Sequence, residues 1–94
     1  MMLTVDTRVV APPDVLIREL DGEAVLLNLA SESYFGLDEV GARMWQVLTT
    51  SESIEAAYDQ LLAEYDVEPE RLRQDVLDLV DQLAAHGLVD LSHD

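Results

Sequence analysis

The side chains of this chain best suited to chemistry are a few carboxylates and two histidines, and their spacing matches neither a calcium loop nor a zinc site. Gln74, Asp78 and Asp81 fall on one side of a predicted helix, and close carboxylates can bind a cation or exchange protons. They lack the spacing of a calcium loop, so a solvated helix face explains them better. His86 and His93 are too few for a zinc site without further nitrogen or sulfur ligands. We therefore expect no metal, no cofactor and no catalytic residue.

The motifs that this sequence lacks exclude further classes of function. The chain has no cysteine, which excludes disulfides, thiol catalysis and cysteine metal sites. It also has no Gly-rich phosphate-binding loop. His86 precedes Gly87 at the predicted end of a helix, where the helix dipole favours a cationic side chain. The sequence thus indicates a binding protein and not an enzyme.

The charge is strongly negative. Twenty acidic residues face five arginines and no lysine, which gives a formal net charge of −15. Nucleic-acid binding depends on cationic side chains that neutralise phosphates, and anionic membrane surfaces make the same demand. A winged-helix DNA-binding protein is a competing interpretation, because such folds often contact DNA. The net charge disfavours it, and we expect neither a nucleic-acid nor a membrane partner.

Length and apolar content predict one small domain. The 94 residues are 49% apolar, which suits a single modest core without a deep substrate cavity. The N-terminus lacks the basic start and apolar run of a signal peptide, and no segment approaches the roughly 18 apolar residues of a membrane helix. We expect a cytoplasmic location.

Turn signals divide the first part of the chain into an arm and three strands. Pro12-Pro13 marks the end of an arm over residues 1–14. Strands are predicted over 15–20, 23–29 and 33–37, the first two joined by the hairpin signal Asp21-Gly22. The second strand is apolar on both faces, so we expect it to be covered on both sides or central in the sheet.

Capping residues predict three helices after the strands. Asp38 and Ser53 are good N-caps, Pro69 suits a first helical turn, and Gly87 suits a helix end. The residues after Gly87 fit either a short strand or a frayed end. Three strands followed by three helices indicate an α+β fold with an antiparallel sheet. We place the domain over residues 15–91, with 92–94 as a tail.

Three ordered segments resemble a known family: VLLNLASESYFGLDEVGARMW, then EYDV, then LAAHGLV. The pattern is similar to the PqqD-like family, the RiPP precursor-peptide recognition elements, over residues 15–91. The resemblance implies a winged-helix-like domain with a three-stranded sheet on three helices. It also implies that the leader segment of a ribosomally made precursor peptide adds to the third strand, in a groove between that strand and the third helix.

The resemblance also implies partners. An acidic, free-standing chain of this size looks like the recognition half of a split lasso-peptide leader peptidase, which would present its precursor to the peptidase or another maturation enzyme. A PqqD-type peptide chaperone in pyrroloquinoline quinone synthesis is the alternative. A structural subunit that uses the same groove for another protein, without leader specificity, is a third possibility.

The predicted peptide-binding residues lie on two elements. The first set is the third strand, Ser33, Tyr34, Phe35, Gly36 and Leu37, where Tyr34 and Gly36 share one face and Phe35 and Leu37 the other. We expect one pair to enter the core and the other to face the elements that cover the sheet. Gly36 permits close backbone approach or a local bend.

The second set comes from the third predicted helix, whose apolar arc is wider than a core stripe. We expect a core-facing stripe of Leu72, Val76, Leu79 and Leu83. Beside it, the groove-lining residues are predicted to be Arg73, Leu77, Val80 and Ala84, with Arg73 available to an acidic partner residue. A competing interpretation is that Leu77 contacts the rest of its own chain.

Overall fold

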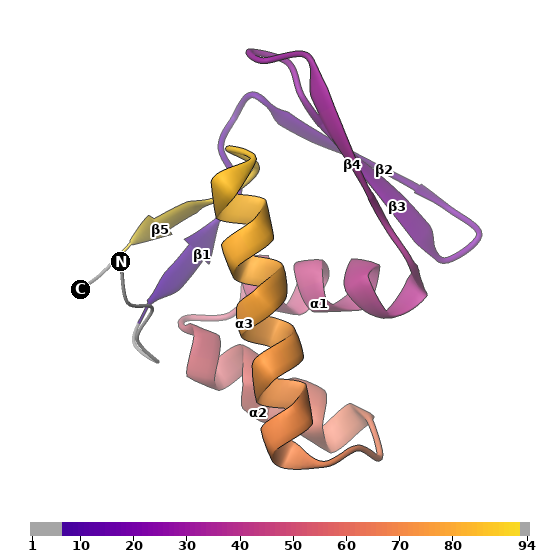
Figure 1. The fold of residues 1–94 in the computed structure, drawn as a ribbon, viewed down its shortest axis with the longest axis vertical. Coiled ribbons are helices and arrows are strands. Elements are labelled where there is room, and N and C mark those ends of the chain that lie inside the picture. The colour runs from indigo at the N-terminus through magenta and orange to yellow at the C-terminus, as the bar shows by residue number, and fades with distance from the viewer. Residues whose placement is uncertain (1–6, 93–94) are drawn as a thin grey trace.

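Antiparallel pairing of three consecutive strands forms the main sheet of the computed structural model, which describes residues 7–92. Figure 1 shows its elements along the chain. They are β1 (Arg8–Val10), β2 (Val15–Leu20), β3 (Glu23–Asn28), β4 (Ser33–Leu37), α1 (Glu39–Thr50), α2 (Ile54–Glu64), α3 (Pro69–Ala85) and β5 (Asp90–Ser92). The predicted α+β fold, a three-stranded antiparallel sheet followed by three helices, is confirmed. His93 lies outside the described residues.

The first hairpin closes as its sequence predicts. Asp21 and Gly22 both have positive φ, 53° and 85°, which is the type I′ geometry that two-residue hairpins prefer. β3 lies between β2 and β4, so it is central. Its two faces differ, however, because Ala24 and Leu26 are buried while Val25 and Leu27 are exposed. The apolar residues on both faces therefore reflect a central strand whose outer face is uncovered within the described chain.

The helix ends follow the capping signals. The Asp38 carboxylate accepts a hydrogen bond from the Gly41 N–H at 2.7 Å, and the Ser53 hydroxyl accepts one from the Ala56 N–H at 3.1 Å. Pro69 begins α3, where its missing N–H has no cost. These local bonds fix where each helix starts.

The end of α3 is a Schellman motif. Gly87 has a φ of 68°, which suits glycine, and its N–H donates to the Ala84 carbonyl at 3.1 Å. The Leu88 N–H donates to the Leu83 carbonyl at 2.9 Å. The chain therefore turns sharply after α3 and buries Leu88.

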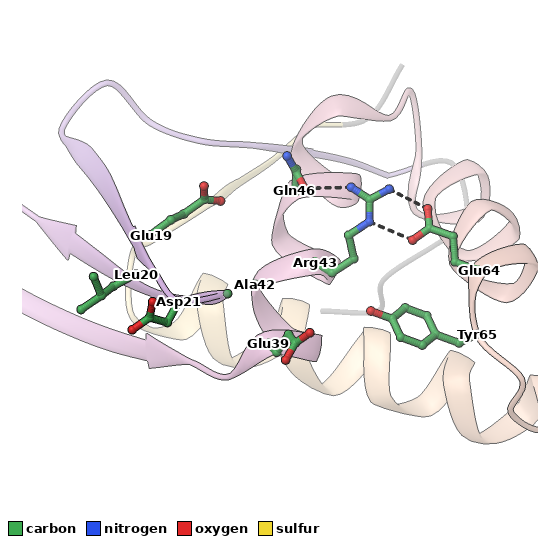
Figure 2. Close-up of a pocket in the computed structure, with 10 residues that line it drawn as sticks. Glu19, Leu20, Asp21, Glu39, Ala42, Arg43, Gln46, Glu64 and Tyr65 are labelled. Atoms are coloured by element: carbon green, nitrogen blue, oxygen red, sulfur yellow. Dashed lines mark hydrogen bonds and ion pairs between the residues drawn. The ribbon is translucent and has the colours of Figure 1, made fainter.

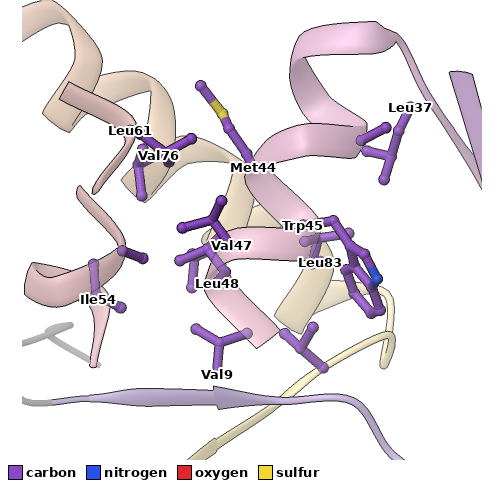
Figure 3. Packing of buried hydrophobic residues seen from close by; sticks show 14 of the residues in the cluster. Val9, Leu37, Met44, Trp45, Val47, Leu48, Ile54, Leu61, Val76 and Leu83 are labelled. Atoms are coloured by element: carbon purple, nitrogen blue, oxygen red, sulfur yellow. The ribbon is translucent and has the colours of Figure 1, made fainter. Parts of the chain in front are cut away.

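The core surrounds α1, with side chains from strands on one side and from α2 and α3 on the other (Figure 3). The buried stripe of α3 is Leu72, Val76, Val80 and Leu83. Leu79, which we expected in that stripe, is only half-buried, and Val80 takes its place. The side of α3 that faces the core is thus centred closer to Val80 than the sequence predicted.

A second, two-stranded sheet joins the two ends of the described chain. β1 and β5 pair antiparallel, with Val9 opposite Leu91, and Val9 is 1% exposed. Part of the segment expected to be an arm therefore packs on the core, and a short strand follows Gly87. Because β1 pairs with β5, no strand within residues 7–92 covers the outer edge of β2 or of β4. No helix in that range is long and apolar enough to cross a membrane.

Candidate peptide-binding edge

The hydrogen-bonding phase of the main sheet follows from its tight turn. Leu20 and Glu23 flank the two-residue loop and form a hydrogen-bonded pair. Backbone bonding alternates along a central strand, so the odd-numbered residues of β3 bond toward β2. The Leu29 N–H donates to the Asp14 carbonyl at 2.9 Å and continues this phase. The even-numbered residues of β3 therefore bond toward β4.

On β4 the same alternation distinguishes residues that bond to β3 from residues whose backbone groups point away from it. Ser33, Phe35 and Leu37 lie opposite the even-numbered residues of β3, so they carry the ladder. Tyr34 and Gly36 direct their N–H and C=O groups away from β3, toward an edge that no strand of residues 7–92 occupies. An extended peptide needs such a row of free backbone groups to add as a strand.

The side chains of β4 alternate between the helices and the outer face. Leu37 is 5% exposed and Phe35 is half-buried against the core, so this pair faces inward. Tyr34 is 76% exposed on the outer face, which it shares with Gly36, so among residues 7–92 no element covers this pair, contrary to our expectation. A Cβ atom at Gly36 would meet no atom within 4 Å, so the fold of this chain alone does not require glycine there.

The last turn of α3 lies beside β4. The rings of Phe35 and His86 are 5.5 Å apart between centroids and tilted by 59°. His86 Nδ1 lies 2.8 Å from the Gln82 carbonyl, and because a carbonyl only accepts, Nδ1 carries the proton. At about 100° per residue, Leu79 and Gln82 share this flank of α3 with His86. The side of α3 next to β4 thus presents the imidazole of His86, the amide of Gln82 and the half-buried side chain of Leu79.

Comparison with known proteins now decides the family. Residues 23–89 match the family model described as coenzyme PQQ synthesis protein D (PqqD). The chain belongs to the PqqD family. The predicted resemblance is therefore confirmed, although a comparison with curated proteins finds no match.

Two solved structures resemble this PqqD-family chain over almost their whole length. The first is TbiB1 in complex with the TbiA(beta) leader peptide, with 34% identity, 90% of this chain and 99% of that chain covered, and a TM-score of 0.81. The second is lasso peptide synthetase B1 complexed with the leader peptide, with 27% identity, 90% and 98% covered, and a TM-score of 0.75. Both of these proteins were solved with a leader peptide bound.

The structure does not bring all the predicted site residues of this PqqD-family domain together. The five residues of β4 form one edge, as expected. Val80 is 0% exposed and lies in the core, so it presents no surface to a groove. The Arg73 guanidinium lies 5.5 Å from the centroid of the Tyr58 ring, on the side of α3 that faces α2. Arg73 therefore does not adjoin β4.

Leu77 and Ala84 belong to the same flank as Arg73. Leu77 is half-buried, packs against the core and lines a hollow of about 430 Å³ with Tyr58 and Arg73. Ala84 follows Leu77 by seven residues, which returns to the same side of a helix. The competing interpretation of Leu77, a contact within its own chain, is thus confirmed. The flank that carries His86 and lies beside β4 is the more polar one, so an apolar arc in the sequence does not point to it.

A second concavity lies at the opposite end of the main sheet. It has a volume of about 490 Å³, between the β2–β3 turn, α1 and α2, and Figure 2 shows its lining. Most of the charged groups that line it are carboxylates: Glu19, Asp21, Glu39 and Glu64. Arg43 donates to Glu64 at 2.6 and 2.8 Å, and this hydrogen bonding lowers the pKa of the Glu64 carboxyl. The surface near β2 is therefore acidic.

The outer face of the main sheet is apolar. Leu16, Val25, Leu27 and Tyr34 are exposed there and line a hollow of about 280 Å³ with Arg18. Arg18 has no ion-pair partner among residues 7–92. An exposed apolar patch on an otherwise charged domain is typical of a contact surface.

Proposed function

We propose that this chain binds the leader segment of a ribosomally synthesised precursor peptide by strand addition to β4. We propose further that it delivers the bound precursor to a leader peptidase in lasso-peptide biosynthesis. The observation that carries the proposal is the free backbone row at Tyr34 and Gly36 beside the last turn of α3. Two neighbours of similar structure that hold leader peptides support it.

Strand addition divides affinity and specificity between backbone and side chains. The guest backbone would pair with Tyr34 and Gly36, in the way a fourth strand continues a sheet. Alternate guest side chains would then face inward, toward Phe35 and His86, or outward, beside Tyr34. The inward positions meet aromatic and apolar surface, so we expect the leader to carry apolar residues at alternate positions.

Delivery requires a surface that the leader leaves free. The apolar outer face of the sheet lies on the side away from the helices. Its Arg18, which has no ion-pair partner among residues 7–92, suits a carboxylate of the enzyme. We therefore assign this face to the maturation enzyme. Catalysis in this proposal belongs to the peptidase and not to this chain.

A PqqD-type peptide chaperone in pyrroloquinoline quinone synthesis is the second candidate. The description of the matching family model favours it, since that model is named for coenzyme PQQ synthesis. The 27% identity with lasso peptide synthetase B1, over 98% of that chain, favours the lasso-peptide function.

Fluorescence anisotropy tests the proposal directly. The probe is a fluorescein-labelled synthetic leader from the precursor encoded beside this gene. We expect a micromolar or tighter dissociation constant, about −8 kcal/mol or better. The unlabelled precursor peptide of pyrroloquinoline quinone serves as competitor, and efficient competition would favour the second candidate. Absence of leader binding would contradict both and leave a structural subunit.

A further inference from the structure

One buried amide connects the two walls of the proposed leader groove. Asn28, the last residue of β3, is 9% exposed and faces the helices. Its Nδ2 donates to the Gly87 carbonyl at 2.9 Å, across a separation of 59 residues. Its Oδ1 accepts from the N–H groups of Ala30 and Ser31 at 2.9 and 3.3 Å. Both its amide nitrogen and its amide oxygen therefore form hydrogen bonds within the chain.

The partners of Asn28 lie immediately before β4 and immediately after α3. Ala30 and Ser31 form the turn that leads into β4. Gly87 follows His86, whose ring contacts Phe35 on β4. The bonds of Asn28 thus set the distance between the start of β4 and the end of α3.

The hydrogen-bond partners at position 28 require an amide side chain. The turn needs only an acceptor, which aspartate or serine also offers. The Gly87 carbonyl needs a donor, which aspartate lacks when ionised. A Cβ atom at Gly87 would come within 3.3 Å of Asn28 Nδ2, so glycine at that position keeps the contact open from the other side.

We propose that Asn28 is a positioning residue of the leader site. It holds β4 and the last turn of α3 at the spacing that fits a guest strand, without touching the leader. The inference rests on the proposed function, since it concerns the affinity of the same groove.

The test compares Asn28→Asp with wild type, using the labelled leader and the aromatic nuclear Overhauser contact between Phe35 and His86. Asn28→Asp keeps the turn acceptor and removes the donor to Gly87. We expect leader affinity about tenfold weaker, the order of one lost hydrogen bond, together with a weakened ring contact. Asn28→Ser repeats the test without an added charge, and it takes the place of Asn28→Asp if that variant fails to fold.

Ser53→Ala is the matched control. It removes the N-cap bond of α2 and lowers stability, but it lies outside the contact between β4 and α3. A purely structural role for Asn28 predicts that Asn28→Asp behaves like Ser53→Ala, with lower thermal stability and unchanged affinity of the folded protein. That result, or an unchanged ring contact, would overturn the inference while wild-type binding upholds the proposed function. Failure of wild type to bind would overturn the proposed function itself.

Discussion

The two edges of the main sheet, β2 and β4, are not paired with any strand of residues 7–92, but their surroundings differ. β2 lies beside an acidic concavity, and its inward-facing Ile17 is 40% exposed. β4 lies beside the last turn of α3, and its inward-facing Phe35 is half-buried against His86. An unpaired edge alone can accept any extended peptide, whereas an edge with a helix beside it also offers side-chain contacts. The contact with the end of α3 is therefore what distinguishes β4 as the proposed binding edge.

The largest effect expected from this comparison comes from proline on each edge. Tyr34→Pro removes an outward N–H without breaking the ladder to β3, so the fold should persist while guest pairing is lost. We expect leader affinity to fall by about 100-fold, equivalent to about 3 kcal/mol. Anisotropy with the labelled leader measures the loss.

Ile17→Pro is the matched control on β2, because Ile17 also directs its N–H away from β3 in the hydrogen-bonding phase of the sheet. It should leave leader affinity unchanged. Tyr34→Ala separates the backbone effect from loss of the phenol ring. Greater damage from Ile17→Pro than from Tyr34→Pro would move the site to the other edge.

A smaller effect is expected from the two flanks of α3. His86→Ala removes the ring beside Phe35 and should weaken leader binding about fivefold to tenfold, within the range of a single aromatic contact. Arg73→Ala, on the flank facing α2, should change it by less than about twofold. Isothermal titration calorimetry on both variants compares the flanks, and the reverse order would restore the helix face first predicted from sequence.

Gly36→Ala should have a smaller effect still. A Cβ atom at this position has open space in the unbound protein, so we expect thermal stability to stay the same or rise slightly. A bound strand would pass close to it, so leader affinity should fall by about threefold. Thermal melts and anisotropy are read together, and a large loss of stability would show that glycine serves the fold.

The smallest effect belongs to the acidic concavity near β2. The pKa of Glu64 is lowered in the folded protein by hydrogen bonds from Arg43, so its contribution to stability is present above the unfolded pKa and is lost as the pH falls through the folded pKa. Glu64→Gln should lower the melting temperature slightly at pH 7, and the difference from wild type should shrink in acid. Leader affinity should not change, because the pair lies away from β4.

Local signals predicted the elements well. The Asp21-Gly22 turn, the Asp38 and Ser53 caps, Pro69 and Gly87 each act within a few residues, so each could be identified from its neighbours alone. The β4 strand over residues 33–37 follows from the same turns.

Long-range relations could not be predicted in this way. Helical periodicity determines which residues of α3 share a flank, but not which flank meets β4. It therefore could not show that Val80 is buried or that Arg73 lies on the flank facing α2. The pairing of β1 with β5 joins residues at opposite ends of the chain and leaves no local pattern. Asn28 did leave a trace, as a lone amide in an apolar strand, whose partner at Gly87 only the fold reveals.

The pairing of β1 with β5 has a consequence for modular use of the domain. Arg8 and Ser92 are register partners, so the described chain enters and leaves at one place. Figure 1 shows that this place lies across α3 from β4. A domain whose two ends meet across a helix from its proposed binding edge can be inserted into, or appended to, a larger polypeptide without obstructing that edge. The same architecture can thus serve as a separate protein or as a domain fused to a biosynthetic enzyme.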